Sequence, residues 1–310
     1  MPVFVGIDVS KDFLDLALGE ESEVERLPNS AAGVRAVAER IRSVDSQNVV
    51  IESTGGYERK VLRALQTAEI SVSLVNPWRV RRFGEALGLL AKTDAIDARL
   101  LARYARQVAP PPTASRSAES LQLVTYTSRR RQLIAMIVAE KARLENAEAW
   151  LRRSIAEVVA LLERRVKKID GLIDEAIARD ESLSKNRDLI QSVPCIGPGI
   201  TRTLLVELPE LGTLSRKEVA SLVGLAPYAR DSGRKQGARR IRSGRHAPRS
   251  ALYLAALNAS RFHPDMKPFY TRLRTNGKPA KVALVAVARK LITSINAIVR
   301  DQRPWVTADS

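Results

Sequence analysis

Short apolar runs alternate with helical patterns along the first hundred residues. Continuous apolar runs at residues 3–7 and 49–51 are typical of buried strands, and Val34, Val37 and Ile41 repeat with the helical period. The pattern predicts three strands, a helix, a strand, a helix, a strand and a helix, at residues 3–7, 12–18, 24–27, 30–43, 48–52, 57–68, 71–75 and 93–107. Asn76 and Pro77 are expected to stop the last strand. This order predicts a mixed α/β sheet.

Three consecutive prolines, Pro110 to Pro112, mark a boundary because proline cannot continue a helix. Residues 115–188 contain no proline and are rich in Ala, Leu, Glu, Arg and Lys, which predicts long helices that pair. Two alternatives stay open, a coiled coil between two chains and a helical hairpin within one chain. We therefore expect a mixed α/β catalytic domain at 1–108, a helical linker and dimerisation region at 109–188 and a third domain at 189–310.

The third domain is expected to be mainly helical. Helices are predicted at 217–223, 249–260 and 281–300, and an Arg/Gly/Ser-rich loop runs from 229 to 246. Residues 193–199 resemble a helix-hairpin-helix turn, in which the backbone at Gly197 and Gly199 can approach a phosphate closely. The alternative is a turn that only packs two helices.

The charge of the chain narrows the class of its partner. The 310 residues carry a formal net charge of +17, which costs self-repulsion unless a polyanion neutralises it. Nucleic acid is therefore the first candidate and an anionic membrane surface the second. The membrane is the weaker candidate, because no apolar run reaches the ~18–20 residues of a spanning helix.

Two further features concern the compartment and the core. One cysteine, Cys195, excludes an internal disulfide and a cysteine-built zinc site. The chain opens directly into a predicted strand, so no signal peptide is expected, and a cytoplasmic, nucleoid-associated protein fits. Trp78, Trp150 and Trp305 are scattered and are assigned to packing.

Four acidic residues lie at strand ends or at the start of a helix in the predicted first domain. Asp8 ends the first predicted strand and Glu52 ends the fourth. Ligands of open sheets lie at the carboxyl ends of strands, so these two carboxylates meet if the two strands are neighbours. Asp94 and Asp97 are three residues apart on the last predicted helix and share one face.

Four converging carboxylates repel one another unless hard cations neutralise them, and oxygen-only ligation suits Mg²⁺ or Mn²⁺. Two such ions about 3.5–4 Å apart can activate the attacking oxygen of a phosphodiester reaction and stabilise the leaving oxygen. Any one of these acids taken alone is as well explained as a turn former or a helix cap. Lys11, Lys92 and Arg99, beside the acids, are candidate phosphate contacts or only balance charge.

Four segments carry a specific resemblance: Gly-Ile-Asp-Val-Ser-Lys at 6–11, Ile-Glu-Ser-Thr-Gly-Gly-Tyr at 51–57, Val-Asn-Pro at 75–77 and Lys-Thr-Asp-Ala-Ile-Asp-Ala-Arg at 92–99. In these motifs the chain resembles the DEDD transposases of the IS-one-ten (IS110) family of bacterial insertion sequences. The resemblance implies a ribonuclease H-like, resolvase-like first domain and a guide RNA encoded by the element. It also implies that the metal-binding catalytic acids are Asp8, Glu52, Asp94 and Asp97.

The basic loop of the third domain contains a second candidate centre at Ser232. By its local sequence, Asp-Ser-Gly is an ordinary turn, and the surrounding cations indicate phosphate binding. The resemblance implies that Ser232, which follows Gly-Leu-Ala-Pro at 224–227, is a nucleophile that forms a covalent phosphoserine link to DNA. His246 is a candidate general base, and Ser243 and Ser250 are rivals for the nucleophile. The nucleic-acid contacts expected in and after this loop are Arg230, Arg234, Lys235, Arg239, Arg240, Arg242, Arg245 and Arg249.

The predicted function is that of a transposase, a DNA recombinase that cuts and rejoins double-stranded DNA as a dimer or tetramer. The main alternative is a metal-dependent Holliday-junction-type endonuclease, which would use the same acids and leave free ends. An actin-like sugar kinase or ATPase would need further glycine-rich phosphate loops, which the sequence does not show. A nucleic-acid-binding protein without enzymatic activity would explain the charge but not the four acids.

Overall fold

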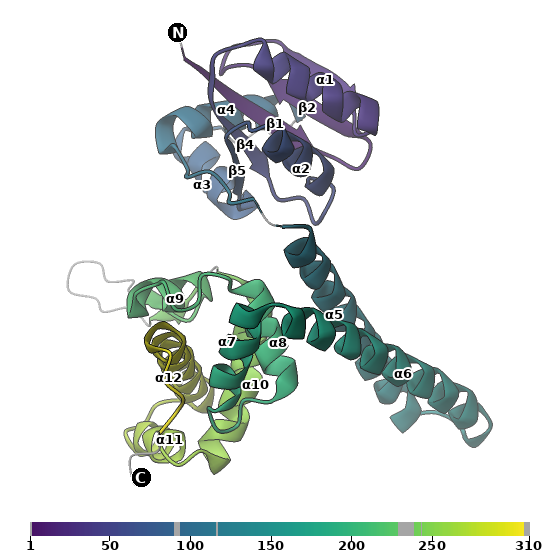
Figure 1. Ribbon diagram of the computed structural model, residues 1–310, viewed down its shortest axis with the longest axis vertical. Helices are drawn as coiled ribbons and strands as arrows, with labels where there is room; N and C mark the ends of the chain where they lie inside the picture. The colour runs from purple at the N-terminus through teal and green to yellow at the C-terminus, as the bar shows by residue number, and fades with distance from the viewer. Residues whose placement is uncertain (1, 90–93, 116, 229–238, 243, 307–310) are drawn as a thin grey trace. The chain divides into compact units, whose positions relative to one another are not determined.

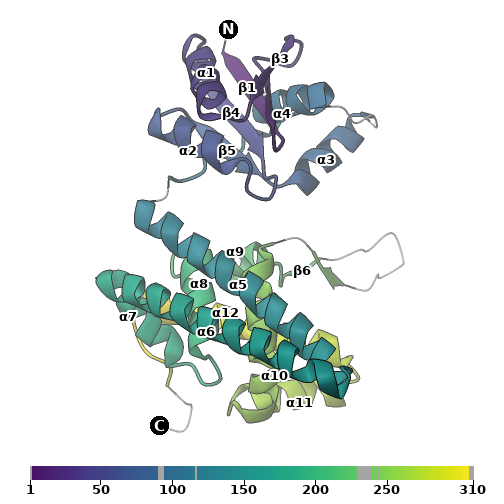
Figure 2. The ribbon, with the colours of Figure 1, turned by 90° about the vertical axis from the view of Figure 1, so that its right-hand side faces the viewer.

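The structure is a computed structural model that describes residues 2–89, 94–115, 117–228, 239–242 and 244–306, with only the backbone described at Asp94 and Ala95. The chain divides into two compact units, Met1–Arg116 and Ser117–Ser310. In the described residues the first unit is α/β, and the second is helical apart from one short β-ribbon (Figures 1 and 2). The predicted fold class, an α/β part followed by a helical part, is confirmed.

The first unit is built on a mixed five-stranded sheet with the strand order β3-β2-β1-β4-β5. Strand β1 is antiparallel to β2 and parallel to β4, with Ile7 opposite Ile51. The carboxyl ends of β1 and β4 therefore lie side by side at one edge of the sheet, as the meeting of Asp8 and Glu52 requires. The strands are β1 (Val3–Val9), β2 (Phe13–Ala17), β3 (Val24–Pro28), β4 (Ser46–Glu52) and β5 (Val72–Val75).

Helices cover both faces of this sheet, because successive side chains of its buried central strands point to opposite faces. Helices α1 (Ala31–Arg42) and α2 (Arg59–Thr67) pack against Val49 and Ile51 of β4. Helices α3 (Pro77–Ala86) and α4 (Asp94–Val108) pack against Val50, which lies between those two residues and points the other way.

Helix α3 is absent from the order of elements that the sequence pattern predicts. Asn76 and Pro77 were expected to stop β5, and they do, but they also begin a helix. The Asn76 side chain accepts a hydrogen bond from the Trp78 backbone N–H at 2.9 Å, and Pro77 occupies the first helical turn. Proline is favoured there because the missing N–H has no helical partner in any case.

Helix α4 lies directly on β1 because the residues between them are small. A β carbon on Gly6 would lie 2.1 Å from the Ala98 carbonyl oxygen and 2.4 Å from the Ala102 backbone nitrogen. Ala98 and Ala102 form a fully buried cluster with Ala17 of β2. This close approach sets the position of α4, and with it the position of Asp97.

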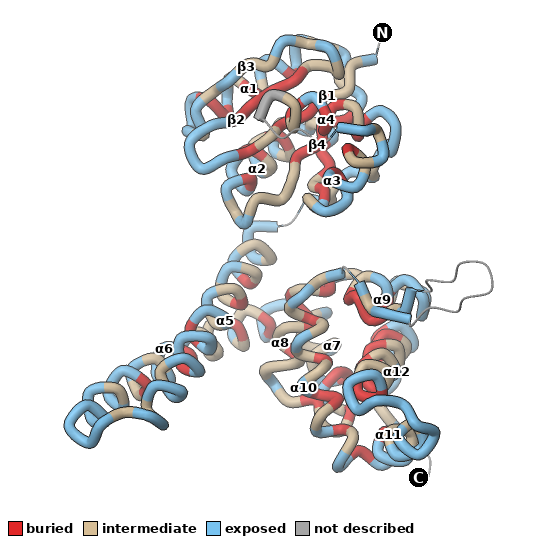
Figure 3. Tube along the Cα trace, turned by 180° about the vertical axis from the view of Figure 1, so that it is seen from behind, coloured by how far each residue is buried: buried red, intermediate tan, exposed pale blue. Residues whose placement is uncertain are grey.

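The second unit begins with two long helices that pair with each other. Helices α5 (Ala118–Glu145) and α6 (Ala149–Arg179) pack through Leu133, Ile137, Val159 and Val166. The predicted pairing of long helices is therefore present within one chain. The end of the pair where α5 turns into α6 is mostly exposed outside these contacts (Figure 3). A coiled coil between two chains stays a prediction.

The rest of the second unit is a bundle around helix α12 (Ala280–Asp301). This helix is long and apolar enough, by length and composition alone, to cross a membrane, but 56% of its apolar window is buried within the unit. Leu291 and Ile295 are fully buried in the main core cluster. The other elements are α7 (Glu181–Gln191), α8 (Pro198–Glu207), α9 (Arg216–Leu222), α10 (His246–Phe262), α11 (Met266–Thr275), and the ribbon of β6 (Pro227–Tyr228) and β7 (Arg240–Ile241).

We expect Gly6→Ala to lower the free energy of unfolding by about 1–3 kcal/mol, because α4 must move away from β1 to admit the methyl group. Urea denaturation followed by circular dichroism measures the change. Gly171→Ala on α6 is the control, because an added β carbon there meets nothing within 4 Å. That variant should be up to about 1 kcal/mol more stable than the wild type. Equal destabilisation by both substitutions would contradict the close approach.

Candidate functional site

Three of the four predicted acids line one cavity at the carboxyl edge of the sheet. Asp8 comes from the end of β1, Glu52 from the end of β4 and Asp97 from the first turns of α4. The cavity has a volume of about 470 Å³, and all three side chains are half-buried. Asp94 begins α4, but its side chain lies outside the described residues.

Backbone hydrogen bonds fix the strand ends that carry these acids. One carboxylate oxygen of Asp8 accepts from the Val9 backbone N–H at 3.0 Å. The residue after Glu52, Ser53, donates its N–H to the Val75 carbonyl at 3.1 Å, so the ladder with β5 continues past Glu52. Asp8 and Glu52 therefore stand at the ends of strands that each pair with two neighbours, β1 with β2 and β4, and β4 with β1 and β5.

A buried acid that the sequence analysis did not single out shapes the loop after Glu52. The Glu58 side chain is 6% exposed, and one of its oxygens accepts from the Thr54 N–H, the Thr54 hydroxyl and the Gly56 N–H at 2.8–3.2 Å. Thr54 lines the cavity. Glu58 is thus a positioning residue for the cavity rim, and its place directly after the 51–57 motif was the signal that could have found it.

Helix α3 forms another wall of the cavity. Trp78, Arg81 and Glu85 line it, and the Arg81 guanidinium lies 3.7 Å from the Glu85 carboxylate. The assignment of Trp78 to packing is wrong, since its side chain is 49% exposed. Trp150 is 79% exposed, so its assignment to packing is wrong as well.

The donor set of the cavity fits a hard divalent cation. The acids that line it offer carboxylate oxygens, and no described lining residue is a cysteine or histidine. Among the described residues, however, no group of three or more acidic, histidine or cysteine side chains is already close enough to hold a metal ion.

The cations predicted beside these acids are placed differently. The Arg99 Nε donates to the Ser22 carbonyl at 2.9 Å, which holds this side chain at the β2–β3 turn and away from the cavity. Lys11 is exposed after β1 and does not line the cavity. Lys92 lies outside the described residues.

In the second unit, the base of the basic loop is firmly held. Strands β6 and β7 pair across it, and an added β carbon on Gly244 would lie 2.2 Å from the Gly224 nitrogen. The Arg245 guanidinium donates to both carboxylate oxygens of Glu210 at 2.6 Å and to the Glu207 carbonyl at 2.8 Å. The charge of Arg245, predicted to meet a phosphate, is therefore balanced within the chain.

Four predicted residues lie outside the described part of the chain: Arg230, Ser232, Arg234 and Lys235.

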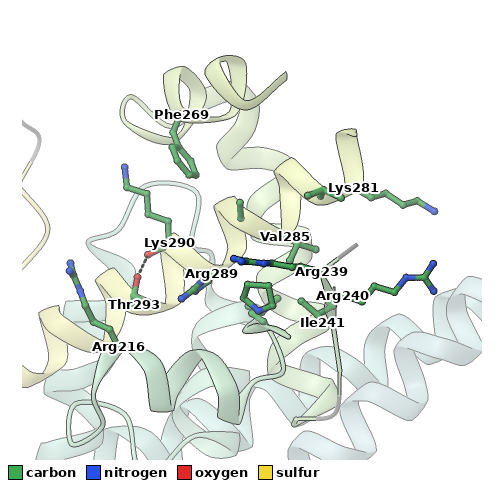
Figure 4. A pocket seen from close by; sticks show the side chains of 14 residues that line it. Arg216, Arg239, Arg240, Ile241, Phe269, Lys281, Val285, Arg289, Lys290 and Thr293 are labelled. Atoms are coloured by element: carbon green, nitrogen blue, oxygen red, sulfur yellow. Dashed lines mark hydrogen bonds between the residues drawn. The ribbon is translucent and has the colours of Figure 1, made fainter. Parts of the chain in front are cut away.

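The remaining predicted loop cations fall into two groups. Arg239 and Arg240 line a second cavity, of about 750 Å³, within the second unit (Figure 4). Arg242 is exposed, and Arg249 is half-buried on α10. Sequence reasoning missed the other cations of this cavity, Arg216, Lys281, Arg289 and Lys290, because they come from helices outside the loop.

The predicted helix-hairpin-helix turn joins α7 to α8. An added β carbon on Gly197 would meet nothing within 4 Å, whereas one on Gly199 would lie 3.4 Å from the Arg130 guanidinium of α5. Arg130 is itself paired with Asp170 of α6. The backbone of this turn is therefore open at Gly197 and covered at Gly199.

The two histidines have different surroundings. His263 is fully buried and packs edge-on against Trp305, and burial holds the pKa of its imidazole below the usual value. Its Nδ1 accepts from the Asp265 backbone N–H at 3.1 Å. His246, the candidate base, is exposed at the start of α10.

Comparison with known proteins identifies the family. A family model described as "Transposase", for the DEDD transposases of IS110, matches residues 5–147, and one described as "Transposase IS116/IS110/IS902 family" matches residues 187–271. The two models together cover more than half of the chain, which belongs to the IS110 family of transposases. It is thus a DNA-acting recombinase, and this part of the prediction is confirmed. The DEDD family suggests dependence on a divalent metal.

Curated relatives agree with this assignment. The chain is 27% identical to the "Pilin gene-inverting protein" of Moraxella bovis, over 97% of each chain. It is 24% identical to the insertion element IS110 43.6 kDa protein of Streptomyces coelicolor, over 96% of this chain and 94% of the relative. It is also 31% identical to an IS900 protein of Mycobacterium paratuberculosis, but over 61% of this chain and half of that protein.

We expect Mg²⁺ or Mn²⁺ to raise the melting temperature of the full chain, because a ligand bound only by the native state stabilises it, by about 2.7 kcal/mol at 100 times Kd. Asp97→Asn should remove most of this shift.

Scanning fluorimetry with each cation and with a chelator measures these shifts. Asp45→Asn is the matched control, since Asp45 is exposed beyond the opposite end of β4. A cation-dependent shift in Asp97→Asn as large as that of the wild type would show that Asp97 binds no cation.

Proposed function

We propose that this transposase cuts and rejoins DNA with four metal-binding acids, Asp8, Glu52, Asp94 and Asp97, and with Ser232 as a nucleophile. The observation that carries the proposal is the convergence of Asp8, Glu52 and Asp97 on one cavity at the carboxyl edge of the sheet. The parallel pairing of β1 with β4 inside a mixed sheet supports the ribonuclease H-like fold that the motifs imply.

In this proposal the acids hold two Mg²⁺ or Mn²⁺ ions, which when bound neutralise charge on the phosphodiester and on the attacking and leaving oxygens. Asp8 and Glu52 supply ligands from adjacent strand ends, and Asp97 supplies one from the helix that lies on β1. Glu58 keeps the loop of Thr54 in place at the rim. Trp78 of α3 lines the same cavity.

The serine step conserves the number of ester bonds. The Ser232 Oγ loses its proton and forms a bond to phosphorus, while the bond from phosphorus to one deoxyribose oxygen breaks. That oxygen takes up a proton and leaves as a hydroxyl group. In rejoining, the hydroxyl of another strand end attacks the phosphoserine, and the serine hydroxyl is restored. Cations near the phosphate, such as Arg239 and Arg240, stabilise the added negative charge of the five-coordinate state.

The relatives favour rejoining over simple cleavage. The printed name of the Moraxella bovis protein says that it inverts a pilin gene. A gene is inverted only when DNA is cut and the ends are joined again in the opposite orientation. An endonuclease that leaves free ends cannot do this, so the similarity supports a recombinase over a simple nuclease.

Target choice and assembly complete the proposal. The net charge of +17 suits a structured guide RNA as well as DNA, and we assign the choice of target to such an RNA. The helices α5 and α6 leave large apolar side chains exposed, which supports their role as the dimerisation region of a three-part chain. These side chains are Ile134, Met136, Val138, Trp150, Leu151, Val158 and Leu161.

The proposal predicts a protein–DNA adduct. The full chain is incubated with end-labelled DNA carrying the element ends, Mg²⁺ and RNA from the element's flanks, and is then run on a denaturing gel. We expect a labelled band at the mass of the protein plus the attached DNA strand. Ser232→Ala should abolish it, and Asp8→Asn should reduce cleavage by about 100-fold or more, because loss of a metal ligand removes transition-state stabilisation.

Two control variants make the test specific. Ser250→Ala, at an exposed position on α10, and Asp45→Asn should leave the adduct unchanged. Free cut ends without an adduct, produced equally by the wild type and Ser232→Ala, would show that the endonuclease alternative is correct.

A further inference from the structure

The second unit contains a basic cavity, and the proposed chemistry uses only two of the residues that line it, Arg239 and Arg240. Figure 4 shows Arg216, Arg239, Arg289 and Lys290 arranged around it, with Phe269 reaching toward it from α11. Its volume is about 750 Å³, and no acidic side chain is found among its described lining residues. Six cations line it in all: Arg216, Arg239, Arg240, Lys281, Arg289 and Lys290.

The walls between these cations are apolar. Phe269 faces Val285 of α12 and Ile241 of β7 across the cavity, and all three are half-buried. The Lys290 ammonium lies 4.9 Å and the Arg272 guanidinium 5.5 Å from the centroid of the Phe269 ring. The cavity thus combines an aromatic surface with positive charge and has room for a flat apolar group.

These properties match an unpaired nucleotide better than a duplex. A duplex keeps its bases stacked inside and would meet only the rim of a concave site, leaving Phe269, Val285 and Ile241 without a partner. An unstacked nucleotide presents a base with a free aromatic face and a phosphate on each side. The volume lies in the range of about 300–1,000 Å³ that is typical of pockets for small molecules.

We propose that this cavity binds one unpaired nucleotide of a DNA strand, with its base against Phe269 and Val285 and its phosphates on the surrounding cations. Pro227 and Arg239, which flank residues 229–238, both line the cavity. The nucleotide is therefore bound against the ribbon of β6 and β7. The choice of DNA over RNA rests on the proposed function, because strand exchange needs unpaired DNA next to the point of cleavage.

Binding of labelled oligonucleotides of about 12 nucleotides, measured by fluorescence anisotropy with a chelator present, tests this proposal. The probes are single-stranded oligo-dT, single-stranded oligo-rU and a DNA duplex of equal length. We expect Phe269→Ala to weaken oligo-dT binding by roughly tenfold, the usual effect of losing one base–aromatic stack, and duplex binding by less than about twofold.

Matched variants separate stacking from folding and from charge. Phe262→Ala removes an aromatic side chain that is 74% exposed on α10 and does not line the cavity, so it should change neither affinity. Because Phe269 also touches the core, Phe269→Leu is the second variant. It should keep the wild-type melting temperature and still lose most of the oligo-dT affinity.

A charge variant tests the phosphate contacts. Arg289→Gln should lower oligo-dT affinity and reduce the slope of log K against log salt concentration by about 0.7. Arg300→Gln lies on the same helix, but its guanidinium is paired with Asp301, and it should leave the slope unchanged.

Three results would overturn the proposal: equal effects of Phe269→Ala and Phe262→Ala, equal weakening of duplex and single strand by Phe269→Ala, or Phe269-dependent binding of oligo-rU but not oligo-dT. The last would assign the cavity to RNA. The assay contains no divalent cation and involves no cleavage. A failure here therefore leaves the adduct test of Ser232 unaffected, and the two proposals fail separately.

Discussion

The arrangement of the acidic cavity depends on the close approach of helix α4 to strand β1 at Gly6. Any larger side chain at that position would meet the α4 backbone at Ala98 and Ala102. Interiors are packed too densely to absorb such a change without a shift of the helix. Since Asp97 precedes Ala98, a shift of α4 would carry this carboxylate away from Asp8. A contact between small apolar residues thus sets the distance between charged ones.

The sheet contributes the second constraint, through strand direction. Parallel pairing of β1 with β4 brings Asp8 and Glu52 to one edge, whereas antiparallel pairing would have placed them at opposite ends. The apolar layers on both faces hold β1 and β4 in the middle of the sheet. Core packing therefore holds the carboxylates of Asp8 and Glu52 at the same edge of the sheet.

Acidic and basic side chains are concentrated in different units of the chain. Acids gather at the cavity of the first unit, and cations gather around the cavity of the second. Some of the cations near the predicted centres have structural partners: Arg245 binds Glu210, and Arg99 binds the Ser22 carbonyl. Only some of the cations predicted from the basic loop are thus available to nucleic acid. Helix α12 adds others, Lys281, Arg289 and Lys290.

The sequence by itself determined the strands and the long helices, and its contiguous motifs carried the resemblance to the family and the prediction of four acids, because strand runs and motifs are properties of neighbouring residues. The sequence pattern did not predict helix α3, because Asn76 and Pro77 both end strand β5 and begin this helix. Tertiary structure alone decided that Trp78 is exposed, that Arg245 is neutralised and that Phe269 shares a cavity with Arg239. Those outcomes depend on contacts between segments that are distant in the chain. The local spacing of apolar and polar residues carries no information about such contacts.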